Sequence, residues 1–162
     1  MKFKEANALN HVAAFHELFD APVLSAPSIP PAERCALRVK LLQEELKELQ
    51  ESIEQNDLVG IADALGDLQY VLSGAVLEFG LGDRFAEVFD EIQRSNMSKT
   101  CRTLEEATKT ATWFENEKNV STQIVQKGEA YIVYRVPDYK ILKSINYSEA
   151  DLKPIIQPDS KV

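Results

Sequence analysis

The stretch from Leu41 to Val76, LLQEELKELQESIEQNDLVGIADALGDLQYVLSGAV, places acidic side chains inside two otherwise apolar helical patterns. Apolar residues recur three and four positions apart in each half, which predicts two helices, at residues 32–55 and 58–79. Between them, Asn56-Asp57 supplies a stop for the first helix and a cap for the second. The acids within these patterns are Glu44, Glu45, Glu48, Asp63 and Asp67.

A helical wheel of residues 32–55 places Glu45 and Glu48 between two apolar strips, with Glu44 at their edge. Glutamates on helices more often face solvent and pair with a residue four positions away. The second helix is apolar nearly all round, as buried helices are, yet Asp63 and Asp67 share one of its faces. Unpaired buried carboxylates are costly and neighbouring ones repel, so a bound cation would relieve both effects.

The residue types indicate which cation would bind. Carboxylates with no histidine or cysteine nearby form an all-oxygen site, which suits Mg²⁺, or alternatively Mn²⁺, better than Zn²⁺. A di-iron helical bundle would need Glu-x-x-His motifs. Neither His11 nor His16 lies three residues after a glutamate, so both are interpreted as ordinary residues of a first helix.

The rest of the chain predicts a mainly α-helical protein with a small β-hairpin appendage towards the C-terminus. We expect an all-α core at residues 1–100, followed at 101–162 by a helix, the hairpin and a tail. The hairpin should turn at Lys127-Gly128-Glu129, and Ile141 and Leu142 are candidates for a third short strand. The other expected elements are a helix at 5–20, a proline-rich connector at 20–33, a helix at 83–99 and a capped helix at 103–116.

Bulk properties exclude several classes of protein. A chain of 162 residues with a net charge of −8 does not have the basic surface of a duplex nucleic-acid binder. No apolar run is long enough to cross a membrane, and the first residues are too polar for a signal peptide. Two cysteines outside any CxxC motif favour a reducing, cytoplasmic location.

Taken together, these segments resemble a known family. EELKEL (44–49) followed by DALGDLQYVLSG (63–74) resembles the all-α nucleoside triphosphate pyrophosphohydrolases, the MazG-like superfamily. FHELFDAP (15–22), EVFDEIQRSNMSK (87–99) and KILKSINYSEADL (140–152) resemble its phosphoribosyl-ATP pyrophosphohydrolase-like subgroup. The resemblance covers most of 8–99 and 139–153, and it leaves 101–138 unexplained.

The acids depart from the family pattern at one position. That pattern is Glu-x-x-Glu, then Glu- or Asp-x-x-Asp on the next helix; Glu45, Glu48 and Asp67 match it. Three residues before Asp67 stands Ala64, and the acid is Asp63, one residue earlier. An i,i+4 pair still shares a helix face. The departure leaves open the number of metal ions and whether catalysis is altered.

The resemblance implies hydrolysis of a nucleoside triphosphate between its α- and β-phosphates, giving a monophosphate and pyrophosphate. It implies Glu45, Glu48, Asp63 and Asp67 as Mg²⁺ ligands, with Glu44 as ligand or base, so that Glu44 and Glu45 promote attack by water. Six further residues are candidates for contacts to phosphate or base, and for each of them the alternative is an ordinary solvent-exposed surface role. These candidates are Arg94, Asn96, Lys99, Lys143, Asn146 and Tyr147. Tyr70 is expected in the core.

Two other functions remain open. One is a helical nucleotide-binding or dimerisation module that has lost catalysis, which the Asp63/Ala64 departure would favour. The other is a phosphoribosyl-ATP pyrophosphohydrolase of histidine biosynthesis. In either case one chain has too few long helices to enclose residues 58–79. We therefore expect a homodimer or a dimer of dimers. The sequence does not name the nucleotide, and clearance of unwanted nucleotides rests on analogy alone.

Overall fold

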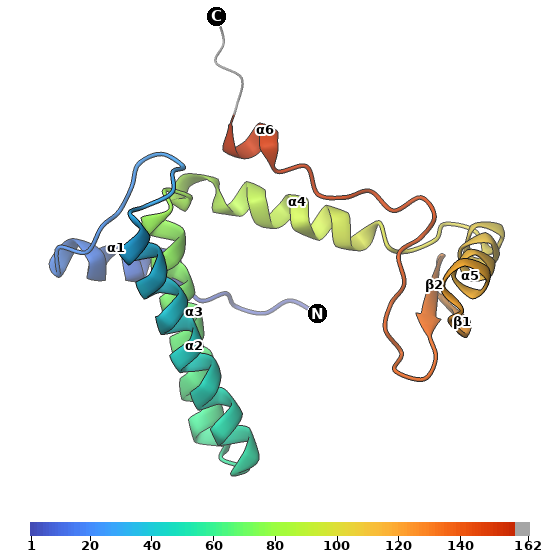
Figure 1. Ribbon diagram of the computed structural model, residues 1–162, viewed down its shortest axis with the longest axis horizontal. Helices are drawn as coiled ribbons and strands as arrows, with labels where there is room; N and C mark the ends of the chain where they lie inside the picture. The colour runs from blue at the N-terminus through green and yellow to red at the C-terminus, as the bar shows by residue number, and fades with distance from the viewer. Residues whose placement is uncertain (158–162) are drawn as a thin grey trace, which may run out of the picture. The chain divides into compact units, whose positions relative to one another are not determined.

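The computed structural model describes residues 1–157, so the last five residues of the predicted tail lie outside it. The chain forms two compact units, Met1–Phe85 and the part from Ala86 on. The fold is mainly helical with a small antiparallel hairpin towards the C-terminus, as the sequence predicts (Figure 1). Within the described residues, no helix is both long and apolar enough to span a membrane.

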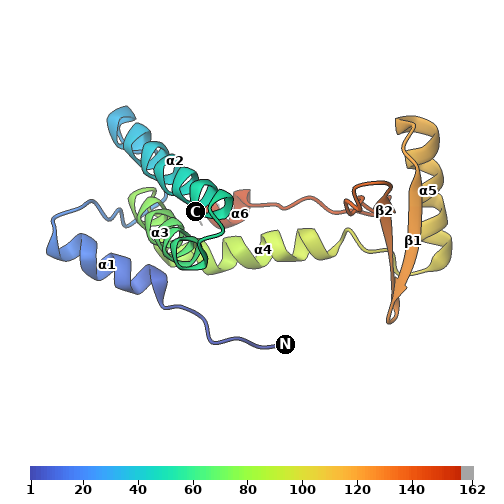
Figure 2. The same ribbon diagram turned by 90° about the horizontal axis from the view of Figure 1, so that it is seen from below.

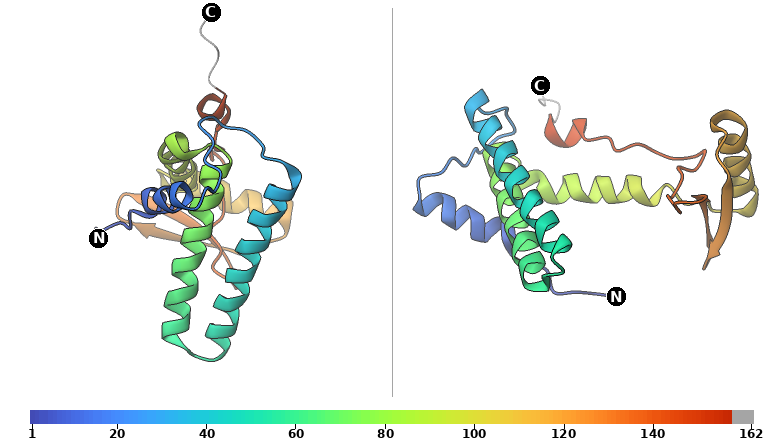
Figure 3. Two further views of the ribbon diagram at one scale, coloured as in Figure 1. Left: turned by 90° about the vertical axis from the view of Figure 1, so that its left-hand side faces the viewer. Right: turned by 60° about the horizontal axis from the view of Figure 1, so that its bottom comes forward.

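The first unit is built on a pair of long antiparallel helices. These are α2 (Ala32–Glu54) and α3 (Leu58–Glu78), which lie side by side in both views of Figure 3. Their ends lie within one residue of the predicted bounds. The Asp57 carboxylate accepts the N–H of Val59 at 3.0 Å, which caps α3 as expected. A shorter helix, α1 (Ala8–Leu18), packs on α3. In the chain, α3 is followed by a 3₁₀ turn at Gly82–Arg84.

The proline-rich connector between α1 and α2 is held against the C-terminal end of α3. The N–H of Leu24 donates to the Leu77 carbonyl at 3.0 Å, and that of Ser28 donates to Phe79 at 3.1 Å. Gly80 has a φ of +68°, and a Cβ there would lie 1.9 Å from the Ala26 carbonyl oxygen. The left-handed backbone and this close approach both require glycine at position 80.

A buried ion pair joins α2 to α3. The Glu78 side chain is 1% exposed, and its carboxylate accepts hydrogen bonds from the guanidinium groups of both Arg34 and Arg38. Burial raises the pKa of Glu78, but the two arginines outweigh it and hold that pKa below its ordinary value. A carboxylate buried in this way is tolerable only because it is paired.

His16 extends this network to α1. Its Nδ1 donates to the Pro22 carbonyl at 2.9 Å, since that oxygen can only accept. Its Nε2 then accepts a hydrogen bond from Arg38 at 3.1 Å. A Cβ at position 74 would lie 2.6 Å from Arg38 Nη1, so Gly74 leaves room for the guanidinium. The expectation that His16 is an ordinary residue of the first helix agrees with this buried structural role.

We predict that Glu78→Gln lowers the free energy of unfolding by about 3 kcal/mol, because it leaves two arginine charges without their carboxylate. The contribution of Glu78 should be present above its unfolded pKa. It should be lost as pH falls from there through the lower folded pKa. Urea unfolding at several pH values measures both effects.

Glu105→Gln is the matched control, since it removes an exposed partner of Lys109 that is 2.6 Å away. It should change the free energy of unfolding far less than Glu78→Gln does, because exposed ion pairs contribute little. Equal effects of the two substitutions would contradict a dominant role for Glu78.

The second unit contains most of α4 (Phe85–Met97), α5 (Leu104–Lys118), β1 (Thr122–Lys127), β2 (Ala130–Arg135) and the short α6 (Lys153–Ile156). Thr103 caps α5 by accepting the N–H of Glu106 at 3.1 Å. The strands pair in the register Thr122↔Arg135 to Lys127↔Ala130 around the predicted turn, where Gly128 has a φ of +60°. Figure 2 shows α5 lying against this hairpin.

A small core fixes α5 on the hairpin. It consists of Cys101, Ala107, Ala111, Val133 and Leu142. The third strand suggested through Ile141 and Leu142 does not form: one bridge joins Ile141 to Tyr134, and the chain then turns away. One hydrogen bond, from the Leu142 N–H to the Val133 carbonyl at 2.9 Å, keeps Leu142 in the core.

Candidate active site

All five acids that the sequence singles out lie along α2 and α3 in the first unit. Glu45 is half-buried, whereas Glu48, Asp63 and Asp67 are exposed. Glu44 is 49% exposed and pairs with Lys40 at 3.3 Å, as expected for a residue at the solvated edge of α2. The helical hairpin therefore carries the carboxylates on its surface within a single chain.

The acids act on one another electrostatically, and Glu45 lies at the centre of their field. Burial is the largest cause of its raised pKa. Repulsion raises the pKa further, in decreasing order, from Glu48, Asp67, Glu44 and Asp63. Acids of both helices therefore contribute to the raised pKa of Glu45.

The position where this chain departs from the family pattern is occupied by a buried residue. Ala64 is 2% exposed, whereas its neighbour Asp63 and the i+4 residue Asp67 are both exposed. An acid at position 64 would have to be buried, which is costly unless a positive charge pairs with it. Asp63 shares the exposed face with Asp67 and contributes to the field at Glu45.

The expectation that the acids sit on a buried face is wrong for the single chain. Much of the apolar surface around them is exposed, with Leu58 and Val59 at 77% and 79%. The cause is that only α1 and α2 pack on α3 within this unit. Among the described residues, no three Asp, Glu, His or Cys side chains converge closely enough to hold a metal ion. Tyr70, expected in the core, is 38% exposed and lies edge-on to Phe15.

The candidates for phosphate and base contacts lie in the second unit, where two segments distant in sequence meet. The Ser98 hydroxyl accepts the N–H of Ser148 at 3.0 Å, and the hydroxyls of Ser95 and Tyr147 are 2.9 Å apart. The RSNMSK segment at the end of α4 therefore lies against the segment from Lys143 to Glu149. The sequence names residues on both segments, and the structure brings these segments together.

The individual side chains differ in how they are used. Arg94 binds both carboxylate oxygens of Glu91 and the Glu149 carbonyl, so it anchors the C-terminal segment to α4. Hydrogen bonds from Arg94 and from the Asp151 N–H lower the pKa of Glu91 to about 2. Lys99 donates to Asn96 at 2.7 Å.

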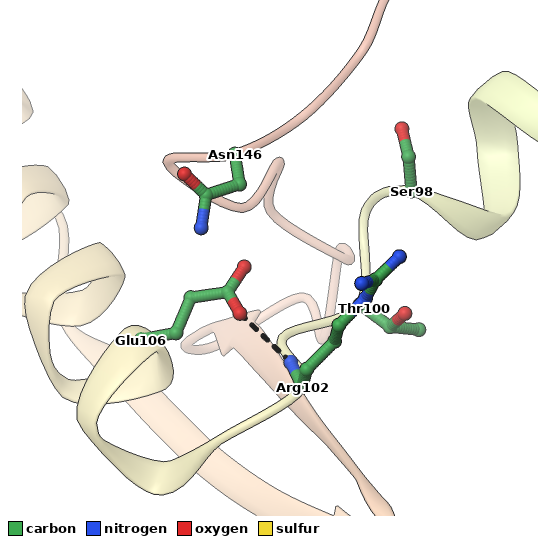
Figure 4. Close-up of a pocket in the computed structure, with 5 residues that line it drawn as sticks. All are labelled: Ser98, Thr100, Arg102, Glu106 and Asn146. Carbon is green, nitrogen blue, oxygen red and sulfur yellow. Dashed lines mark hydrogen bonds between the residues drawn. The ribbon is translucent and has the colours of Figure 1, made fainter.

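A polar pocket of about 340 Å³ lies between these segments, lined by Ser98, Thr100, Arg102, Glu106 and Asn146 (Figure 4). Figure 4 shows the Asn146 amide facing the Glu106 carboxylate across it. Glu106 accepts the N–H of Arg102 at 2.9 Å and the hydroxyl of Ser144. Burial raises the pKa of Glu106, but these hydrogen bonds outweigh it and the pKa is lowered.

A comparison with protein families identifies the class. The sequence model of the phosphoribosyl-ATP pyrophosphohydrolase family matches residues 12–96, which is more than half of the chain. The protein therefore belongs to this family, within the MazG-like all-α superfamily. The match includes α2, α3 and all five carboxylates, and it ends before α5 and the hairpin. No curated protein matches the chain.

Sequence reasoning missed two features of the structure. The pairing of Glu78 with Arg34 and Arg38 was not predicted from the sequence. The i,i+4 spacing of these arginines was the available signal. Trp113 and Lys118 on α5 were not singled out either, although they line a second pocket beside Tyr147.

We predict that Glu45→Gln raises the free energy of unfolding of the metal-free protein by roughly 0.5 kcal/mol at neutral pH. The raised pKa means that ionised Glu45 opposes folding, and this cost should disappear as pH falls through that pKa. Unfolding in the presence of a chelator measures it. Glu51→Gln is the control, because Glu51 pairs with Lys47 at 3.2 Å and should give no gain.

Proposed function

We propose that the protein is a Mg²⁺-dependent nucleoside triphosphate pyrophosphohydrolase. Membership of the family supports a nucleotide pyrophosphohydrolase in general. The observation that carries the more specific proposal is the placement of five carboxylates on two adjacent helices, four of which raise the pKa of the fifth, Glu45. Water would attack the anhydride between the α- and β-phosphates and release a nucleoside monophosphate and pyrophosphate.

The chemistry of the donor set fits Mg²⁺, or alternatively Mn²⁺. Oxygen ligands alone suit a hard cation, and a positive charge near Glu45 would relieve the repulsion that raises its pKa. Glu45, Glu48, Asp63 and Asp67 are the proposed ligands. When bound, the ion would neutralise phosphate charge and favour attack by water.

Glu44 is the best candidate for the base. It lies beside Glu45 on α2 but is exposed, and its partner Lys40 forms only a surface ion pair. Its carboxylate is thus free to accept a proton from water, whereas Glu45 at the centre of the cluster is better placed as a ligand. Among the residues of the second unit, Asn96, Lys99 and Asn146 are proposed phosphate contacts.

We predict that a panel of ribo- and deoxyribonucleoside triphosphates with Mg²⁺ yields pyrophosphate, and that Glu48→Gln lowers kcat at least 100-fold without unfolding the protein. Glu51→Gln is the control, because it removes only the exposed partner of Lys47, and it should retain full activity. Release of pyrophosphate is measured directly. A folded protein that turns over no nucleotide would refute the proposal, and binding without turnover would favour the inactive module.

Hydrolysis of phosphoribosyl-ATP is a second candidate, favoured by the name of the family that matches residues 12–96. Including this compound in the panel separates the two. A kcat/KM for phosphoribosyl-ATP far above that for any simple triphosphate would assign the protein to histidine biosynthesis. A kcat/KM for a simple triphosphate far above that for phosphoribosyl-ATP would support hydrolysis of unwanted nucleotides.

We further propose that a second copy of the chain covers the apolar surface of α2 and α3, giving a homodimer or a dimer of dimers. The support is the run of exposed apolar side chains on these helices. They are Val39, Leu46, Ile53, Leu58, Val59, Leu65 and Leu72. A surface of this extent is unusual for a stable monomer.

Light scattering at micromolar concentration should therefore give at least twice the mass of the 18.2 kDa chain. The double substitution Val59→Glu and Leu65→Glu should shift the protein towards the monomer. Leu104→Glu, at an exposed position on α5, should not. A wild-type protein that stays monomeric would contradict the proposal.

A further inference from the structure

The second unit contains an apolar pocket of about 590 Å³ that the family match does not cover. Its walls come from α5 and from residues 143–149. Trp113, Phe114 and Ile145 supply the apolar surface, while Lys118 and Lys143 lie among the lining residues. The volume lies in the range of pockets that hold small-molecule ligands.

Three aromatic rings in this pocket are held in place by neighbouring groups. The Phe114 ring packs against the small core, and the Trp113 ring meets it edge-on with their centroids 4.8 Å apart. Trp113 is nevertheless 44% exposed, so one part of the indole remains free to stack. On the other side, the Tyr147 hydroxyl lies 2.9 Å from that of Ser95 on α4. The rings are thus ordered in advance of any ligand.

The backbone between the two walls is also fixed. The Ile145 N–H donates to the Thr110 hydroxyl at 3.1 Å, and Thr110 is fully buried. The Asn146 N–H donates to the buried Ser144 hydroxyl at 3.0 Å. The Ile145 contact and the hydrogen bond from the Ser144 hydroxyl to Glu106 tie this segment to α5, so the protein itself holds this wall of the pocket in place.

The cations are placed to meet an anionic ligand. Lys118 Nζ lies 5.4 Å from the centre of the Trp113 ring, and Lys143 Nζ lies 4.1 Å from the centre of the Tyr147 ring. Glu149 is the only acid lining the pocket; it is exposed and lies 3.7 Å from Lys143. The pocket therefore has a positive balance, although the whole chain has a net charge of −8.

We propose that this pocket binds a nucleoside phosphate, with the base stacked on Trp113 and the phosphate held by Lys118 and Lys143. An aromatic face accepts any base, and a lysine at each side supplies a flexible cation for phosphate. The inference goes beyond the proposed hydrolysis, since it requires neither turnover nor a metal ion. It also gives a role to the segment 101–138, whose function the family resemblance leaves unexplained.

Trp113 is the only tryptophan in the chain, so its fluorescence reports on this pocket directly. With a chelator present, AMP and ATP should change the fluorescence saturably, and adenosine should do so more weakly. Pyrophosphate alone should produce no comparable change. No saturable change at millimolar concentrations of any of the four common ribonucleotides would overturn the proposal. So would a change that follows protein concentration alone, since that would place another subunit against Trp113.

Substitutions test the stacking of the base and the binding of the phosphate separately. Trp113→Ala should weaken AMP binding at least tenfold by calorimetry, whereas Trp113→Phe should stay within about threefold of the wild type. The double substitution Lys118→Gln and Lys143→Gln should weaken AMP at least tenfold and leave adenosine unchanged. Lys109→Gln on α5, whose partner is Glu105, is the control and should have no effect. Equal loss in the control and the double variant would overturn the proposal.

Kinetic measurements decide whether the nucleotide in this pocket is the substrate itself or a separate regulator. If the substrate itself occupies the pocket, Trp113→Ala should raise KM and leave kcat nearly unchanged. If a separate nucleotide regulates the enzyme, KM should stay constant and activation or inhibition by added nucleotide should disappear. The inactive Glu48→Gln variant should keep the fluorescence response. Failure of hydrolysis therefore leaves this proposal standing, and loss of the response leaves the hydrolysis proposal standing.

Discussion

The buried carboxylate of Glu78 is the constraint on which the first unit depends. Its ion pairs with Arg34 and Arg38 join the start of α2 to the end of α3, and His16 brings α1 into the same network. At the opposite end, the capped turn at Asp57 fixes the same two helices. The carboxylates around Glu45 lie between these fixed ends. Their mutual repulsion is therefore opposed by contacts that lie outside the acidic residues themselves.

The two units differ in the chemistry they offer. The first holds the carboxylate cluster and most of the excess of acids over bases in the chain. The second holds the polar pocket beside Asn146 and the aromatic pocket beside Trp113. The family match covers the first set of features but ends before α5. The proposed metal chemistry thus rests on the part that the family model matches, and the proposed base recognition rests on residues outside that match.

Features fixed by near neighbours could be predicted from the sequence. The bounds of α2 and α3, the cap at Thr103 and the turn at Gly128 all depend on residues within a few positions. Helical spacing also placed the five acids on the two long helices, although among residues 1–157 no three acidic, histidine or cysteine side chains converge as a metal site would require. Pairing across long distances was missed: Glu78 is 44 residues from Arg34. The helical wheel also assumed that an apolar face is covered by its own chain, and α3 shows that it need not be.

The hydrogen bonds between Ser98 and Ser148 have a consequence for how such a chain can be altered. Residues 99–147 begin and end next to each other, because the residues that flank them, Ser98 and Ser148, are hydrogen-bonded. This segment contains α5 and the hairpin. A short linker between these two serines would span a small gap, and the entropy of closure changes slowly with loop length. This lobe is therefore a natural site for excision, replacement or transplantation into a shorter relative, with the path of α4 left as it is.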